Sequence, residues 1–257
     1  MLIASVSYGN DSIALLQWLH EHGYTTRDRV LCVYADTGWA SHEWPARVER
    51  AEAWARSIGV EPHRVARPGG LVALSRLKRA WPRHGMQFCT EDLKVRTITD
   101  FLSTVDPEAE ATVCIGVRRE ESERRSQWPE HVPDSPKHGG RDAWFPLVTM
   151  REPDRNALVE RAGFEVLPYR SRECHPCVNA NKVDIRSLSE ARIAEIEQLE
   201  AAMGVGESGA PKTFFRPAAH GGAVGIRAVA RWARSERGRF SDAQGELWAC
   251  DSGFCGS

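Results

Sequence analysis

Short apolar runs that lead directly into helical patterns are the feature that most constrains the fold of this 257-residue chain. Leu2–Val6 precedes a helical repeat of apolar residues that extends to Gly23, and Val30–Ala35 precedes a second helical pattern, Ser41–Ile58. Continuously apolar strands are typical of parallel sheets that are covered on both faces. The alternation therefore predicts an α/β domain with a parallel sheet. Further strands are expected at residues 60–65 and 112–116.

The sequence changes character past about residue 126. Residues 128–142 contain three prolines and two glycines with little periodicity, which predicts a loop. Helices are expected at residues 152–163, 189–203 and 226–237, the last of them rich in arginine. We therefore predict a nucleotide-binding domain over residues 1–185. A helical C-terminal extension with a cysteine-containing tail is expected over residues 186–257.

Composition excludes some classes of protein and leaves others open. With 34 Lys and Arg against 35 Asp and Glu, the chain lacks a globally basic coat for nucleic acid, although a local basic cleft remains possible. No apolar run approaches the length of a membrane-spanning helix, and the first residues do not resemble a signal peptide. A cytoplasmic protein without a membrane partner is expected. Seven cysteines, an odd number, argue against a full disulfide framework and point to a metal, a cluster or reactive thiols.

The polar segment between the first strand and the first helix, Ser7-Tyr8-Gly9-Asn10-Asp11-Ser12, has the composition of a phosphate-binding loop. Successive backbone N–H groups in such a turn form an anion nest, and the N-terminus of the following helix adds partial positive charge. Ser7 and Ser12 offer hydroxyl donors, while Gly9 permits close backbone approach. The loop is neither a Walker A motif nor G-x-G-x-x-G. An ordinary helix-capping turn is the alternative interpretation.

Five elements together resemble a known family, the PP-loop ATP pyrophosphatases, in the branch of the phosphoadenosine phosphosulfate (PAPS) reductases. The first loop is similar to S-G-G-x-D-S, and Asp36-Thr37-Gly38 is similar to the D-T-G element after the second strand. The remaining three elements follow in family order over about residues 1–185: Phe88-Cys89-Thr90-Glu91-Asp92-Leu93-Lys94, then Gly116-Val117-Arg118-Arg119-Glu120-Glu121-Ser122, then Phe145-Pro146-Leu147 before a late C-x-x-C.

This resemblance implies an adenine nucleotide α-hydrolase-like, Rossmann-like fold that binds ATP or an adenylyl sulfate. The residues implied to bind nucleotide are Ser7, Tyr8, Gly9, Asn10, Asp11, Ser12, Asp36, Thr37, Gly38, Gly116, Arg118 and Arg119. Asp11, Lys94 and Arg118 are the implied catalytic residues, and Mg²⁺ would bridge the ATP phosphates without a protein cage. The arginine cluster of Arg118, Arg119, Arg124 and Arg125 suits phosphate or phosphosulfate, because guanidinium groups bind such oxyanions at two points. A solvated segment with Glu–Arg pairs is the alternative. Tyr8 departs from the glycine common at its position.

The cysteines fall into three groups. Cys32 and Cys114 lie inside apolar runs and are expected to pack as small hydrophobic residues. Cys89 together with the C-x-x-C pair of Cys174 and Cys177 is spaced as in relatives that carry a [4Fe–4S] cluster, so the resemblance implies that these three are metal ligands. Relatives have Cys-Cys where this chain has Phe88-Cys89, which removes one of four ligands. Structural zinc, completed by His175 or a tail cysteine, and unliganded thiols are the alternatives.

The tail holds two further cysteines, Cys250 and Cys255. PAPS reductases carry a nucleophilic cysteine in an E-C-G-x-H tail, and this tail does not match that motif. Either cysteine is a candidate fourth ligand, and Cys255 is a candidate catalytic residue for sulfur delivery.

The function favoured by these observations is an ATP pyrophosphatase and sulfurtransferase of the PAPS reductase family. ATP would adenylate an acceptor with release of pyrophosphate, and sulfur from a cysteine desulfurase or another donor would displace AMP. The expected acceptor is a nucleic acid, either DNA in phosphorothioation or tRNA in thiolation. Two alternatives are an assimilatory reductase that converts adenylyl sulfate to sulfite, and a non-catalytic nucleotide-binding subunit. The chain is also expected to form a homo-oligomer or to belong to a larger modification complex.

A basic stretch in the C-terminal extension is a further candidate for phosphate contacts with nucleic acid. Its arginines recur near helical spacing, and a solvated helix face is the alternative interpretation. They are Arg227, Arg231, Arg234, Arg237 and Arg239.

Overall fold

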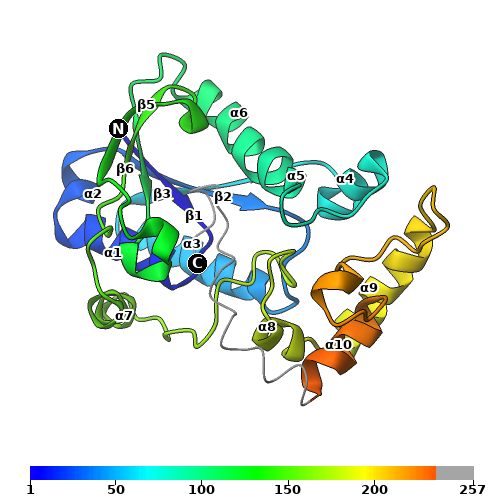
Figure 1. Cartoon of the computed structure of the whole chain (residues 1–257). Coiled ribbons are helices and arrows are strands. Elements are labelled where there is room, and N and C mark those ends of the chain that lie inside the picture. Colours follow the sequence, from blue (N-terminus) through cyan, green and yellow to red (C-terminus); the bar gives the residue numbers. More distant parts are fainter. Residues whose placement is uncertain (236–257) are drawn as a thin grey trace. The chain divides into compact units, whose positions relative to one another are not determined.

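The computed structural model describes residues 1–235, which divide into two compact units (Figure 1). The first unit comprises residues 1–67 and 90–174, and the second comprises residues 68–89 and 175–235. The second unit thus takes one segment from the middle of the chain as well as the C-terminal part. The division at residue 185 that the sequence suggested stays a prediction.

A six-stranded sheet forms the centre of the first unit, with the strand order β3-β2-β1-β4-β6-β5. All neighbours pair in parallel except β5, which runs antiparallel to β6. The predicted α/β fold with a parallel sheet is therefore confirmed. The strands are β1 (Leu2–Val6), β2 (Val30–Asp36), β3 (Val60–Ala66), β4 (Thr112–Ile115), β5 (His131–Ser135) and β6 (Arg141–Trp144).

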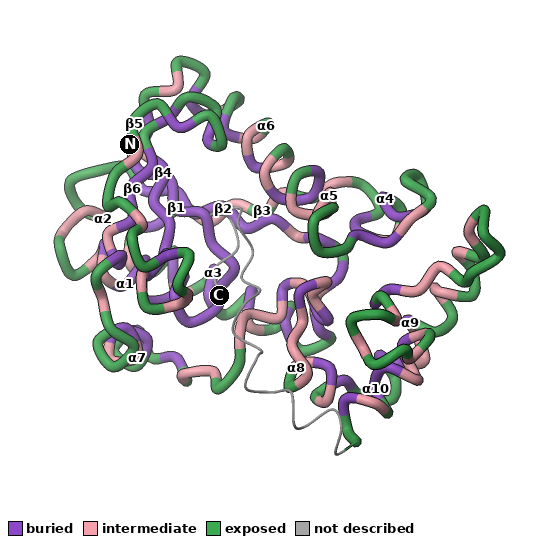
Figure 2. Tube along the Cα trace, in the orientation of Figure 1, coloured by how far each residue is buried: buried purple, intermediate pink, exposed green. Residues whose placement is uncertain are grey.

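Helices cover both faces of this sheet, which explains why the central strands are continuously apolar. Alternate residues of β1 point to opposite sides, so that Leu2, Ala4 and Val6 join one core cluster while Ile3 joins another. The first cluster also contains residues of α1 (Asn10–Glu21), α3 (Trp44–Ser57) and α7 (Glu152–Arg161). The second contains residues of α6 (Arg96–Val105). Figure 2 shows these strands buried along their length.

The smaller helical elements of the first unit lie in its connections. They are α2 (Tyr24–Arg27), a π-helical turn (Glu91–Val95) and three 3₁₀ turns (Arg119–Glu121, Glu123–Arg125 and Pro136–His138).

The loop predicted for residues 128–142 is wrong, because this segment contains β5 and the first half of β6. The strand β6 is only four residues long, and it is held by parallel pairing with β4, in which Val113 faces Ala143 and Cys114 faces Trp144. A strand this short shows no periodicity, and β5 contains Pro133, which is unfavourable within a strand. Pairing with distant strands therefore determines that this segment is extended, although its local sequence does not indicate a strand.

The second unit is helical over the residues that the structure describes. Its elements are α4 (Gly70–Lys78), α8 (Lys182–Arg186), α9 (Glu190–Met203), a 3₁₀ turn (Pro217–Ala219) and α10 (Ile226–Arg234), and α5 (Phe88–Thr90) begins in it. The helices predicted at 152–163 and 189–203 are confirmed as α7 and α9, and the predicted basic helix is α10 as far as Arg234. Within residues 1–235 no helix is both long enough and apolar enough to cross a membrane.

One buried ion pair fixes the short strand β6 to α6. Arg141 is 2% exposed and donates from Nε to Asp106 Oδ2 at 2.6 Å, and from Nη2 to the Leu102 carbonyl oxygen at 3.1 Å. Burial alone would raise the pKa of Asp106, but the hydrogen bonds from Arg141 and from the Ala111 amide outweigh burial and lower it. The ion pair therefore stabilises the fold above the pKa that Asp106 has in the unfolded chain, and this contribution is lost as the pH falls through the lowered value.

Arg141→Met is expected to lower the free energy of unfolding by about 3–5 kcal/mol at neutral pH, because it leaves the Asp106 carboxylate buried without its cation. Arg161→Met is the matched control, since Arg161 forms an exposed ion pair with Glu21 at 2.7 Å and its loss is expected to cost at most about 1 kcal/mol. Urea denaturation of the two variants at several pH values measures both effects. The stabilising role of the Arg141–Asp106 ion pair would be contradicted if both variants lost the same free energy of unfolding. It would also be contradicted if the difference between their free energies of unfolding did not decrease in acid.

Candidate functional site

The Ser7–Ser12 loop joins β1 to α1 at the carboxyl edge of the sheet. The Ser7 amide donates to Ser12 Oγ at 2.8 Å, the two hydroxyl oxygens lie 3.1 Å apart, and the Gly9 amide donates to Ser7 Oγ at 3.3 Å. No side chain caps α1, because its N-cap residue is Gly9. Asn10 instead exchanges two hydrogen bonds with the backbone of Leu167, at 2.9 and 3.0 Å. The first backbone N–H groups of α1 therefore donate to no capping side chain. An anion-binding turn requires such N–H groups.

Tyr8 contributes its backbone to this loop, while its ring lies in the core. Its φ of +60° is in the left-handed region that glycine adopts freely, and the completely buried ring packs against Tyr34 at 5.6 Å between centroids. Its hydroxyl oxygen lies 3.4 Å from Cys32 Sγ, and burial raises the pKa of Tyr8 far above its usual value. Arg47 Nε donates to the Tyr8 carbonyl oxygen at 2.8 Å. The side chain at this family-atypical position therefore points away from the loop's polar groups.

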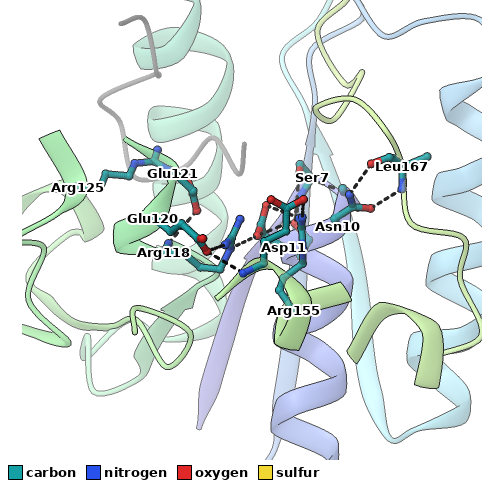
Figure 3. Close-up of polar contacts among 12 residues, drawn as sticks. Ser7, Asn10, Asp11, Arg118, Glu120, Glu121, Arg125, Arg155 and Leu167 are labelled. Carbon is teal, nitrogen blue, oxygen red and sulfur yellow. Dashed lines mark hydrogen bonds and ion pairs between the residues drawn. The ribbon is translucent and has the colours of Figure 1, made fainter. Parts of the chain in front are cut away.

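Asp11 is the centre of a buried cluster of charges next to the loop (Figure 3). Its carboxylate accepts from Arg118 Nε at 2.7 Å and lies 3.4 Å from Arg155 Nη1 at both oxygens. Asp11 is 1% exposed, and both arginines are 6% exposed. Burial lowers the pKa of Arg155, and the charge of Asp11 opposes that effect. Two guanidinium groups thus share one carboxylate out of contact with solvent.

This cluster occupies the point at which the strand order of the sheet reverses. The strands β1 and β4 are neighbours, and their connections leave in opposite directions along the sheet. Asp11 follows β1, and Arg118 follows β4. In open α/β sheets, ligands bind in the crevice outside the carboxyl ends of the strands at such a switch point.

Two other arginines of the 118–125 segment, Arg119 and Arg125, are held by protein groups. Arg119 Nε donates to the Trp128 carbonyl oxygen at 2.9 Å, and Arg125 forms a buried ion pair with Glu121. Glu121 also accepts the Arg118 amide at 2.8 Å. Figure 3 shows the side chain of Arg118 directed toward Asp11 and that of Arg125 directed toward Glu121. Of the arginines expected to bind phosphate, Arg118 is therefore the one that the fold places beside the loop.

A second group of predicted residues follows β2. The Gly38 amide donates to Asp36 Oδ1 at 2.9 Å, whereas Thr37 is completely buried and donates its hydroxyl to the Glu173 carbonyl oxygen at 2.9 Å. The Cys174 thiol donates to Thr37 Oγ1 at 3.3 Å. The D-T-G element thus anchors the segment that begins the C-x-x-C motif, while the Asp36 carboxylate lies at the end of the strand.

Lys94 forms an ion pair with Glu173, and both side chains are less than 10% exposed. Glu173 Oε2 is buried without a hydrogen-bond partner among the described residues. The nearby ring of Tyr34 has a raised pKa because of its burial and the negative charges of Glu173 and Asp36. The cation predicted for phosphate binding is thus neutralised at short range, and its catalytic role stays a prediction.

The predicted metal ligands do not gather in the part of the chain that the structure describes. Within residues 1–235 no group of three or more His, Cys, Asp and Glu side chains is positioned to hold a metal ion. Cys174 ends the first unit, while Cys89 and Cys177 belong to the second. Cys250 and Cys255 lie outside the described residues. Ligation of a cluster or zinc by these cysteines therefore stays a prediction, and we assign no chemical step to either metal. Cys32 and Cys114 are buried in the core, as predicted.

Two arginines of the basic helix α10 form ion pairs with glutamates of the neighbouring helix α9. Arg227 forms ion pairs with Glu197 at 2.9 Å and Glu190 at 3.2 Å, and Arg234 pairs with Glu190 at 3.1 Å. These side chains are half exposed, so the arrangement corresponds to the solvated helix face that we considered as the alternative to nucleic-acid contacts. Arg237 and Arg239 lie outside the described residues.

Three residues that the fold brings to these sites were not predicted from the sequence: Arg47, Arg155 and Glu173. Arg155 falls within a correctly predicted helix, but a charged residue on a helix looks like part of a solvated face until its burial is known. Glu173 directly precedes Cys174 of the C-x-x-C motif, and this position was the sequence signal that could have marked it as a site residue.

Comparisons with known proteins identify one family model and several similar solved structures. The family model described as phosphoadenosine phosphosulfate reductase domain matches residues 1–176. The phosphate complex of phosphoadenylyl-sulfate (PAPS) reductase from Candida auris is 13% identical with a TM-score of 0.45, covering 64% of this chain and 73% of that one. The U34-tRNA thiolase NcsA from Methanococcus maripaludis, solved with its [4Fe-4S] cluster, is 14% identical with a TM-score of 0.44, covering 100% and 76%. No curated protein sequence matches the chain.

Two glycines permit the backbone contacts of the site. A Cβ added at Gly116 would lie 2.7 Å from the Asp11 carbonyl oxygen, and one added at Gly9 would lie 2.8 Å from Ser171 Cβ. Gly116→Ala is expected to push β4 away from α1 and to lower the free energy of unfolding by about 1–3 kcal/mol. Thermal denaturation measures this change.

Gly206→Ala is the matched control, because the nearest atom to its added Cβ is the Ala210 carbonyl oxygen at 3.7 Å. It is expected to change the free energy of unfolding by less than about 0.5 kcal/mol. If the two variants melted at the same temperature, the close approach of β4 to α1 would not be the reason for a glycine at position 116.

Proposed function

The chain belongs to the phosphoadenosine phosphosulfate reductase domain family, and on this premise we propose that it binds ATP and splits it between the α and β phosphates to activate an acceptor for sulfur transfer. The observation that carries this proposal is the buried Asp11 carboxylate with its guanidinium partner Arg118 beside the Ser7–Ser12 loop. Loop amides, hydroxyl groups and a buried arginine are the donors that a chain of phosphates requires.

The proposed chemistry uses these donors for positioning and charge stabilisation. An acceptor oxygen attacks the α-phosphorus, the bond to the bridging oxygen breaks, and pyrophosphate leaves with the negative charge. The amides at the start of α1 and the guanidinium of Arg118 stabilise that charge. Mg²⁺ bound to the phosphates themselves supplies further neutralisation. Sulfur at the oxidation level of sulfide then attacks the activated acceptor, and AMP leaves with the former acceptor oxygen. If a cysteine desulfurase supplies the sulfur as a persulfide, with Cys255 as the candidate thiol for delivery, a thiol reductant must cleave the disulfide that forms between the acceptor and Cys255.

The proposed acceptor is a nucleic acid, DNA in phosphorothioation or tRNA in thiolation. This part of the proposal rests on the resemblance of the motifs to sulfurtransferase-type relatives. The ion pairs of α10 with Glu190 and Glu197 lend it no support.

Pyrophosphate release from ATP and Mg²⁺, measured with and without DNA and tRNA, tests the activity. We expect release that depends on an acceptor and falls at least about tenfold in kcat/KM in Ser12→Ala, because that change removes a hydroxyl group from the loop. Ser103→Ala is the matched control, since the Ser103 hydroxyl donates to the Thr99 carbonyl oxygen on the exposed face of α6.

Three other outcomes would argue against the proposal. Sulfite production from adenylyl sulfate with a thiol reductant, without a requirement for ATP, would identify an assimilatory reductase. ATP binding without release of pyrophosphate in the presence of either nucleic acid would identify a nucleotide-binding subunit. An equal loss of activity in Ser12→Ala and Ser103→Ala would remove the loop hydroxyl from the mechanism.

We further propose that the full chain holds a [4Fe–4S] cluster on Cys89, Cys174 and Cys177, with zinc as the competing metal. The preference of such clusters for thiolate ligands supports this assignment, and the fourth ligand would come from His175, Cys250, Cys255 or a bound sulfur species. Anaerobic purification followed by analysis of iron, sulfide and zinc is the test. Cys177→Ser is expected to lose the metal, whereas Cys114→Ala, a change in the core, is expected to retain it. Wild-type protein without either metal would contradict this part of the proposal.

A further inference from the structure

Arg155 is a buried cation that the family motifs do not include. It lies in the middle of α7 and points toward Asp11 from the side opposite to Arg118 (Figure 3). Its Nη1 atom is 3.4 Å from both carboxylate oxygens, a long contact, whereas Arg118 Nε approaches to 2.7 Å. The Nε atom of Arg155 is buried and has no hydrogen-bond partner among the described residues. The side chain therefore carries a donor that this structure leaves unused.

The charges around Asp11 do not all lie inside the protein. One buried carboxylate faces two buried guanidinium groups, and the other carboxylates that pair with these arginines, those of Glu120 and Glu152, approach at 3.1 and 3.5 Å from the exposed side. The outer partners of the arginines, Glu120 and Glu152, have side chains that are 50% and 62% exposed, so solvent screens their charges. A buried cation with incomplete pairing is unfavourable unless an anion completes the pair.

The position of these buried cations indicates which kind of anion would bind them. Asp11 belongs to the first turn of the twelve-residue helix α1, so the positive charge adds to that of the helix N-terminus and of the loop amides. A group that satisfied all of these donors would be a tetrahedral oxyanion with several negative oxygens. The phosphate chain of a nucleotide has that chemistry.

We propose that Arg155 is a further binding residue for the anionic substrate and donates from Nε to the phosphate group held at the Ser7–Ser12 loop. This inference rests on the proposed function, because it assigns Arg155 to the same nucleotide site. In this arrangement Asp11 positions both arginines, and Arg155 uses Nη1 toward Asp11 and Nε toward the phosphate. A lysine would supply the charge but not two donors in a fixed plane.

Isothermal titration of the full-length protein with inorganic pyrophosphate tests the assignment. Arg155→Gln is expected to weaken binding about 10- to 100-fold, because it removes a charged hydrogen-bond donor. Arg155→Lys keeps the charge opposite Asp11 and is expected to weaken binding less than Arg155→Gln does. Arg161→Gln is the matched control on the same helix, since Arg161 pairs with Glu21 at the surface, and it is expected to bind pyrophosphate as the wild-type protein does.

A purely structural role for Arg155 predicts a different result. Folded Arg155→Gln protein would then bind pyrophosphate with unchanged affinity while melting at a lower temperature, and that outcome would overturn the inference. If Arg155→Gln did not fold, unchanged affinity in Arg155→Lys would overturn it equally. The proposed function fails separately, through the absence of pyrophosphate release from ATP by wild-type protein that binds pyrophosphate.

Discussion

The buried carboxylate of Asp11 connects three parts of the first unit that are far apart in sequence. It belongs to the first turn of α1, and it contacts Arg118 after β4 and Arg155 on α7. A buried carboxylate is unfavourable without cations, and two buried arginines are unfavourable without an anion, so each group requires the others. The carboxyl ends of β1 and β4 are thereby held together at the switch point of the sheet. The Ser7–Ser12 loop owes its position to this contact and to the glycine at position 116.

The second site contrasts with the first in its electrostatics. Around Asp11 two buried guanidinium groups share one buried carboxylate, whereas the buried ammonium group of Lys94 is matched by the buried carboxylate of Glu173. Thr37 connects the second site to Cys174 through its hydroxyl, so the end of β2 and the start of the C-x-x-C motif are structurally coupled. That coupling places a cysteine of the chain beside the sheet edge where nucleotides bind in this class of fold.

Much of the fold could be predicted from the pattern of apolar residues. Continuous apolar runs indicate strands that are buried on both faces of a sheet, and a helical repeat of apolar residues indicates a helix with one buried face. The strands at residues 2–6, 30–36 and 112–115 and the helices α7 and α9 follow from that pattern. The short strand β6 did not, because four residues give no period and its partner β4 is distant in sequence. The loop motif, Asp11 and Arg118 could be recognised because each lies in a short motif of neighbouring residues. Arg155 and Glu173 were not, because a charged side chain becomes informative only when its burial and its partner are known.

By itself, the sequence determined the α/β class, the phosphate-type loop after the first strand and the order of the family motifs. These properties depend on neighbours in the chain: apolar runs, turn residues and short spacings. Tertiary structure alone decided which charges meet. It turned the Tyr8 ring into the core, neutralised Lys94 with Glu173, and brought Arg155 to Asp11 across 144 positions of sequence. The physical reason is that an ion pair between distant residues depends on how helices pack on the sheet, and packing depends on the whole chain.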